Sequence, residues 1–330
     1  MSMPDFTDLT DLASRTLAGS VVYANDELFA ERENLIRPEP PTHAAAAFGH
    51  KGKVYDGWET RRRRSPGHDW AVVRLGAAGI VHGVVVDTAY FTGNYPPEIS
   101  VEATSAEDYP SPAELEAASW TSLVDRTAAR GDSVNQYAVS NRDRWTHVRL
   151  SIYPDGGVAR FRVHGTVVPD PRFLQGTVDL AAMENGGTLV ETSDAFYSSP
   201  VNLILPGRAR IMGDGWENAR RRGDGNDYAV FRLAARGRLR HVEVDTSYFV
   251  GNAPGWVRLT AADETADGAT SWWDVVPRRP VQPDTRHRFL VEDRRPATHV
   301  RLDVFPDGGL SRLRCHGEVE ADALAELARR

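Results

Sequence analysis

Apolar and polar residues alternate along short segments of this chain, and Gly, Pro, Asn and Asp separate the segments. Val84 and Val86 recur at period two in GVVVD, as do Val242 and Val244 in HVEVD. This alternation is typical of strands with one face on a core. AVVRL and GVVVD, with the turn-permissive GAAG between them, therefore predict two successive strands, and AVFRL and HVEVD predict the same pair.

A later segment predicts a hairpin, because PDGG stands between two alternating runs. In the first run the apolar positions are expected inside, namely Val148, Leu150 and Ile152, and the others outside, namely His147, Arg149, Ser151 and Tyr153. In the returning run Phe161 and Val163 are expected inside, and Arg160, Arg162 and His164 outside. A second hairpin repeats the pattern, with His299, Arg301, Arg312, Arg314 and His316 outside.

The chain carries two copies of one unit. The stretch 56–96 returns 158 residues later as 214–254 without a gap, and THVRL…PDGG…HG from Thr146 returns 152 residues later from Thr298. Segments 20–36 and 188–204 match at an offset of 168, so copy one holds ten extra residues, within PEPPTHAAAAFGHKGK. A period this long indicates whole domains rather than stacked solenoid units.

About eight short strands per copy, at roughly 10–20-residue spacing, predict an all-β fold of two tandem jelly-roll β-sandwich domains. The expected domains are 1–169 and 170–330, divided near VVPDPRF. Strands are expected to open each copy at Val21–Tyr23 and Leu189–Glu191, and EISVEA and WVRLTA predict later ones. SPAELEAASW and the C-terminal ADALAELARR predict short helices.

Composition narrows the class of protein. A net charge of −7 argues against nucleic-acid binding, despite the arginine runs at 61–64 and 220–222. No apolar run approaches the roughly 20 residues of a membrane-spanning helix. The start of the chain lacks a signal-peptide pattern. We therefore expect a cytoplasmic protein that binds neither nucleic acid nor membrane.

Metal and thiol chemistry have little support in the sequence. The single cysteine, Cys315, aligns with Val163 on an apolar face, which predicts a small buried hydrophobe. No linear metal motif occurs. His147 and His164, or His299 and His316, could meet across the hairpins, but arginines beside them favour an outward or interface face. No metal site is therefore predicted, and dependence on a divalent ion stays open.

The DGWE motif offers acid–base chemistry. Trp58 is expected to anchor the turn in the core, so that Glu59 projects from a fixed base, followed by arginines that hold carboxylates. An Arg–carboxylate network that only braces the sandwich explains the same residues equally well. His68 and Arg61 face Asn226 and Ala219 in copy two, which favours copy one as the working half.

These motifs resemble allantoicase, also called allantoate amidinohydrolase. DGWETRRRR…GHDWAVVRLG, VVDTAYFTGNYP and the repeated THVRL…PDGG…HG carry the resemblance, which covers nearly the whole chain. It implies a hydrolase that converts allantoate to (S)-ureidoglycolate and urea in purine degradation. It also implies two jelly-roll domains of the galactose-binding type and a homo-oligomer.

For that reaction we expect one group to protonate the departing urea and another to deprotonate water, as in glycoside hydrolysis. The predicted catalytic residues are Glu59, His68 and Asp69. The predicted substrate-binding residues are Arg62, Arg63, Asp87, Tyr90, Glu217, Arg221 and Asp227, with Arg62 and Arg63 on the substrate carboxylate. Two alternatives remain: an inactive relative or sugar-binding jelly-roll pair, and an ammonia-releasing amidohydrolase on the same substrate.

Overall fold

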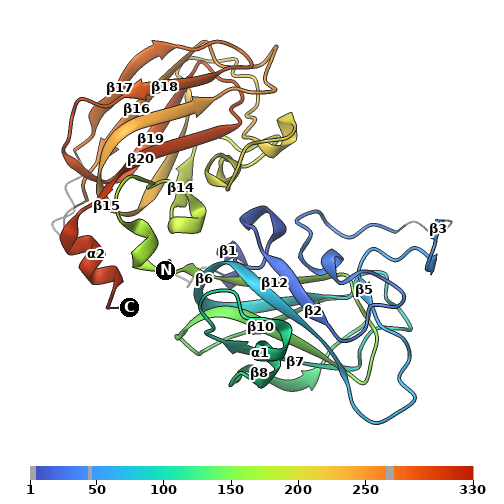
Figure 1. Cartoon of the computed structure of the whole chain (residues 1–330). Coiled ribbons are helices and arrows are strands. Elements are labelled where there is room, and N and C mark those ends of the chain that lie inside the picture. Colours follow the sequence, from blue (N-terminus) through green and yellow to red (C-terminus); the bar gives the residue numbers. More distant parts are fainter. Residues whose placement is uncertain (1–4, 44–46, 265–270, 330) are drawn as a thin grey trace. The chain divides into compact units, whose positions relative to one another are not determined.

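The computed structural model describes residues 5–43, 47–264 and 271–329. The chain divides into two compact units, Met1–Val168 and Pro169–Arg330. Each unit contains an 8-stranded antiparallel sheet, so the all-β expectation is confirmed (Figure 1). The sequence places the division one residue later than the structure does. The insertion of copy one includes residues 44–46, which lie outside the described part of the chain.

The strands of unit 1 are β1 Thr10–Asp11, β2 Ser20–Ala24, β3 Phe48–Gly49, β4 Gly52–Lys53, β5 Trp58–Glu59, β6 Asp69–Asp87, β7 Glu98–Thr104, β8 Thr121–Ala128, β9 Val134–Ala138, β10 Arg144–Tyr153, β11 Gly157–Val158 and β12 Arg160–Val167. Its helices are the 3₁₀ segments η1 Phe6–Asp8, η2 Arg15–Leu17 and η3 Arg32–Ile36, and the α-helix α1 Pro112–Ala117. Ser111 and Glu114 form a capping box at the start of α1, which explains why the predicted helix begins there.

The strands of unit 2 are β13 Val178–Asp179, β14 Thr188–Thr192, β15 Asp227–Asp245, β16 Trp256–Ala262, β17 Trp273–Pro280, β18 Arg286–Leu290, β19 Pro296–Phe305 and β20 Arg312–Val319. Its helices are η4 Pro171–Leu174, η5 Met183–Asn185, η6 Pro200–Ile204, η7 Met212–Asp214 and α2 Ala321–Leu327, red at the C-terminal end in Figure 1. Among the described residues no helix is long and apolar enough to cross a membrane.

One long strand organises each unit. The N-terminal half of β6 pairs with β2 and β10, whereas its C-terminal half pairs with β9 and β12. In unit 2, β15 pairs in the same way with β14 and β19 and then with β18 and β20. A single backbone therefore takes part in both layers of each sandwich.

This topology corrects two predictions. The segment GAAG is not a turn, because it continues β6 through its middle. The two runs around PDGG are not hydrogen-bonded partners, because β6 lies between β10 and β12 in the sheet order, as β15 lies between β19 and β20. The Asp-Gly pair instead connects two strands that flank the long one.

The predicted apolar faces are confirmed. Val84, Val86, Val148, Leu150, Ile152, Phe161, Val163 and Cys315 are fully buried. The opposite face is not uniformly outward, however. His147 is only 1% exposed and Arg160 only 2%, and His299 and Arg312 in unit 2 are buried as well. Ser151 is also only 1% exposed, so the outward assignment of these five residues is wrong, because loops and neighbouring side chains cover the second face.

Candidate functional site

The DGWE loop is built the same way in both units. Trp58 is fully buried, and its indole Nε1 donates a hydrogen bond to the Asp26 carbonyl at 2.7 Å. Trp216 donates equivalently to the Asp194 carbonyl at 2.9 Å. Strand β5 pairs with β11, so that Glu59 lies opposite Gly157. The anchoring role predicted for the tryptophan is confirmed.

Glu59 occupies a buried, weakly compensated position. Asn94 Nδ2 donates to its Oε1 at 2.6 Å, while its Oε2 has no hydrogen-bond partner among the described residues. Burial raises the pKa of Glu59, and the hydrogen bond from Asn94 opposes the shift. The Asn252 amide donates to Glu217 Oε1 at 2.7 Å in unit 2. The arginines that follow the motif do not pair with these glutamates.

Arg63 pairs instead with Asp69, whose side chain is 2% exposed. Asn25 Nδ2 also donates to Asp69 Oδ1, at 2.9 Å. His68 stands beside this pair and packs against the Tyr153 ring, with centroids 4.6 Å apart. Burial, followed by the charges of Arg149 and Arg63, lowers the pKa of His68. Arg221 and Asp227 form the same ion pair in unit 2.

The remaining predicted site residues lie apart from that pair. Asp87 ends β6, opposite Arg160 in register, and burial raises its pKa. Tyr90 is 45% exposed, and its ring stacks on His43 with centroids 5.2 Å apart. Arg62 is exposed and forms no hydrogen bond or ion pair with the described residues.

The structure thus brings Arg63, His68 and Asp69 together. No hydrogen bond or ion pair joins Glu59 to them within the described residues. Because both units keep the Arg–Asp pair and the Asn–Glu bond, these contacts fit a network that braces the loop. Arg63 was predicted to bind the substrate carboxylate, but its guanidinium already forms an ion pair with Asp69.

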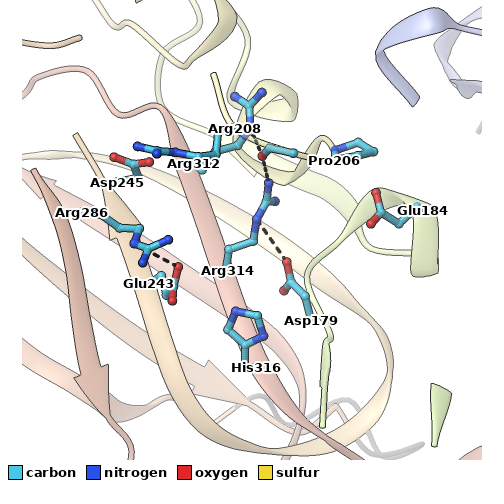
Figure 2. Close-up of a pocket in the computed structure, with 11 residues that line it drawn as sticks. Asp179, Glu184, Pro206, Arg208, Glu243, Asp245, Arg286, Arg312, Arg314 and His316 are labelled. Atoms are coloured by element: carbon cyan, nitrogen blue, oxygen red, sulfur yellow. Dashed lines mark hydrogen bonds and ion pairs between the residues drawn. The ribbon is translucent and has the colours of Figure 1, made fainter. Parts of the chain in front are cut away.

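A different arrangement lies in unit 2, where a cavity of about 430 Å³ opens beside β15 and β20 (Figure 2). Its lining is strongly charged. It includes the arginines Arg208, Arg286, Arg312 and Arg314, the acids Asp179, Glu184, Glu243 and Asp245, and His316. The volume lies within the range of small-ligand sites, and the lining suits a small anion with polar substituents.

Arg312 is a buried cation of this lining that forms no ion pair with a described carboxylate, although the charges of Asp214 and Asp245 act on it. Its guanidinium donates to the carbonyls of Asp214 and Ser311, each at 2.7 Å. Its counterpart in unit 1, Arg160, has an ion pair with Asp56 at 2.9 Å. Burial and the nearby charge of Arg314 lower the pKa of Arg312 to about 10. An anion bound in the cavity would stabilise this guanidinium.

Two of the four acids in the cavity, Asp179 and Glu184, have a carboxylate oxygen without a hydrogen-bond partner among the described residues. The backbone amides of Ala181 and Cys315 donate to Asp179 Oδ1, at 3.1 and 2.8 Å, whereas no described residue donates a hydrogen bond to Asp179 Oδ2. The Oε2 atom of Glu184 is also buried without a partner. Burial raises the pKa of both groups. Arg314 opposes the shift at each, and the charge of Asp179 adds to that of Glu184.

Sequence reasoning missed this cavity, although comparison of the copies contains a signal for it. Glu184 stands where copy one has Thr16, at the offset of 168, and Glu243 stands where it has Val85. Polar groups that only one copy carries are not explained by a fold that both copies share. Comparison of the copies by sequence points to polar residues found only in copy one, such as His68 and Arg61, and not to those found only in copy two.

The comparisons with known proteins agree with this two-unit architecture. A family model described as the allantoicase repeat matches residues 10–168 and again 178–320. The chain belongs to the allantoicase family. It is 56% identical over 318 residues to a probable allantoicase of Nocardia farcinica, with 95% of each chain covered. It is 42% identical to an allantoicase of Dictyostelium discoideum, over 93% of this chain and 86% of that protein.

The fold is that of allantoicases as well. A crystal structure of allantoicase from Saccharomyces cerevisiae superposes with a TM-score of 0.80 at 34% identity, covering 94% of this chain and 93% of that one. The resemblance read from the DGWE and THVRL motifs is therefore confirmed, together with the two tandem jelly-roll domains.

Proposed function

We propose that the protein hydrolyses allantoate to ureidoglycolate and urea, and that the cavity of unit 2 is where it does so. The reaction is supported by its similarity to proteins named as an allantoicase and a probable allantoicase. One observation carries the choice of site: a buried arginine that forms no ion pair with a described carboxylate, Arg312, lines the same cavity as the carboxyl groups of Asp179 and Glu184.

The substrate carboxylate would bind among the arginines of the cavity. Arg208 is exposed and forms no hydrogen bond or ion pair with the described residues, and Arg286 lies 3.8 Å from Glu243. Together with Arg312 they present planar donors of the kind that hold carboxylates with paired hydrogen bonds. A neutral ureide would leave these charges unpaired, so the site favours the acid over its uncharged analogues.

The reaction replaces one C–N bond by a C–O bond. The leaving ureido nitrogen must gain a proton as its bond to the central carbon breaks, while the other ureido nitrogen donates electrons to that carbon. Water then forms the C–O bond and loses a proton. One group must therefore give a proton and another must take one, and general acid–base catalysis by such a pair contributes typically about 10²–10⁴-fold.

We assign the proton donor to Glu184 and the acceptor to Asp179. Burial raises the pKa of Glu184, against the charge of Arg314, and the negative charge of Asp179 adds to the rise, which favours the protonated form of Glu184. Arg314 lies 3.6 Å from Asp179 Oδ2 and favours the ionised form of that carboxyl group. The Oδ2 atom accepts no hydrogen bond from a described residue and would take the proton of the attacking water, while Oδ1 stays bound to backbone amides.

The DGWE cluster of unit 1 is the competing location. There Glu59, with Asp69 or His68, would supply the proton transfers, and Arg62 would bind the carboxylate. The partnerless Oε2 of Glu59 and the raised pKa of that residue favour this reading. Its separation from the Arg63–Asp69 pair and the matching contacts in unit 2 count against it.

Two isosteric substitutions distinguish the sites. Purified Glu184→Gln and Glu59→Gln are incubated with allantoate, and urea, ureidoglycolate and ammonia are measured. We expect Glu184→Gln to lose at least 100-fold in kcat, at the lower end of the usual contribution of one acid–base group, and Glu59→Gln to keep most activity. Urea-unfolding midpoints establish that each variant is folded.

The reverse result would move the site to unit 1. Absence of urea from the wild-type protein, with or without added divalent metal, would favour a binding protein or an inactive relative. Ammonia as the first product would instead indicate an amidohydrolase.

The homo-oligomeric state and the cytoplasmic location stay predictions. The resemblance to allantoicase implies the first, which light scattering at several concentrations tests.

A further inference from the structure

Two histidines and one glutamate converge at the edge of the unit 2 cavity. His241 and Glu243 are two residues apart on β15 and so point to the same face, and His316 on β20 lies directly opposite His241 in register. One ligand atom from each residue lies within 4.8 Å of the others. The two imidazole rings stack with centroids 4.4 Å apart.

The fold does not require this trio. At the equivalent positions of unit 1, Gly83 and Val85 replace His241 and Glu243, although His164 is kept. The Phe6 ring covers that place, since a Cβ on Gly83 would lie 2.3 Å from Phe6 Cδ2. The same β-bulge interrupts the pairing of both units here. Unit 2 has therefore acquired imidazole and carboxylate groups on a backbone that unit 1 uses for apolar packing.

The neighbouring cations do not prevent an ion from binding. Arg288 and Arg286 contact Glu243 at 3.0 and 3.8 Å; the two arginine side chains are 62% and 48% exposed, so either guanidinium can turn towards solvent, whereas the Glu243 side chain is 13% exposed. Arg314 donates to the carbonyls of Leu205 and Gly207, each at 2.6 Å. Glu243 can thus exchange its exposed arginines for a stronger ligand.

We propose that His241, Glu243 and His316 bind one divalent transition-metal ion. Two imidazoles and one carboxylate are a donor set that suits manganese, iron, cobalt or zinc. Three protein ligands leave coordination positions open for water or a substrate oxygen.

The location gives the ion a role, which rests on the function proposed above. Glu243 and His316 line the same cavity as Asp179 and Glu184, and Figure 2 shows His316 below Arg314 with the Glu243 carboxylate alongside. An ion there would polarise a ureido carbonyl or lower the pKa of the attacking water. Asp179 and Glu184 would keep their proton transfers.

Metal binding is measured without reference to activity. The full-length chain, stripped with chelator, is titrated with MnCl₂ and with CoCl₂ by calorimetry, and cobalt is also followed by its visible absorption. We expect one ion per chain and at least a tenfold weaker affinity in His241→Ala and in Glu243→Gln. His164→Ala is the matched control, because it removes the histidine that unit 1 shares with unit 2, and it should bind like the wild type.

Failure to bind either ion below millimolar concentration would overturn the proposal. So would equal affinity in His241→Ala and the wild type. The two proposals fail separately: loss of turnover in Glu184→Gln without any metal binding keeps the cavity as the active site and removes the ion. Metal binding with full turnover in Glu184→Gln keeps the ion and moves the catalytic groups elsewhere.

Discussion

His147 provides a quantitative test of the burial found on the supposed outer face. It is 1% exposed on β10, and its Nδ1 lies 2.9 Å from Thr146 Oγ1. Burial and the charge of Arg74 lower its pKa to about 4, against a weaker opposing effect of Glu107. The ordinary pKa of a histidine side chain is 6.5. The unfolded chain therefore binds more protons than the folded one between these two values.

The sign of the effect follows from that difference. The stabilisation that depends on a neutral His147 is fully present above the unfolded pKa and is lost as the pH falls towards the folded pKa. Between pH 7.5 and pH 4.5 this residue alone should remove about 2–3 kcal/mol from the free energy of unfolding. His147→Asn lacks the titrating group, so the stability gap between wild type and variant should narrow by that amount.

Urea unfolding followed by tryptophan fluorescence at several pH values measures the gap. Ser151→Ala is the control, because Ser151 is equally buried on the same strand and does not titrate in this range. Its gap to the wild type should not vary with pH. If the His147→Asn gap is constant within about 0.5 kcal/mol over the range, the buried neutral imidazole is not the cause of acid sensitivity.

Two further substitutions test the charged contacts. Asp69→Asn leaves Arg63 without its carboxylate and should lower the free energy of unfolding by about 3 kcal/mol. Glu33→Gln is the control: it breaks the exposed pair with Arg15 and should lower the free energy of unfolding by under about 1 kcal/mol. Equal urea midpoints in the two variants would contradict the bracing role of Asp69. Arg208→Ala should raise the KM for allantoate about tenfold with little change in kcat, as expected when ground-state binding is lost. If KM rises in Arg62→Ala and not in Arg208→Ala, the substrate carboxylate binds in unit 1.

Much of the fold could be predicted because its signals are local. Period-two alternation identified the buried valines of β6 and the apolar face of β10, and the tandem copies indicated two similar domains. The turn predicted at GAAG and the hairpin predicted at PDGG were wrong for a physical reason. Gly76 and Gly79 serve close approach rather than chain reversal, since a Cβ on either would lie 2.1 Å from the Leu17 carbonyl oxygen or 2.3 Å from that of Thr166. Both contacts come from distant segments.

The candidate site was harder to predict than the fold. Residues kept in both copies, such as Asp69 and Asp227, look catalytic by type, yet the structure uses them in matching ion pairs. The cavity instead depends on single-copy changes, such as Glu184 for Thr16, whose meaning appears only when η5 is placed beside β20 and Arg312. No linear motif joins groups that come from four strands, one 3₁₀ helix and one loop.

The long strand shared by both layers also explains where the two copies differ in length. A residue added inside β6 would turn every later side chain of that strand to the opposite face, moving valines out of the core in one layer while leaving the other intact. Because the added residue would lie within the strand, no loop could restore the orientation of the side chains that follow it. Correspondingly, the offset of 158 residues runs without a gap from Asp56 to Pro96, and the ten extra residues of copy one lie upstream of β5. Duplicated domains of this kind can change their loops freely, but they inherit their central strand at fixed length.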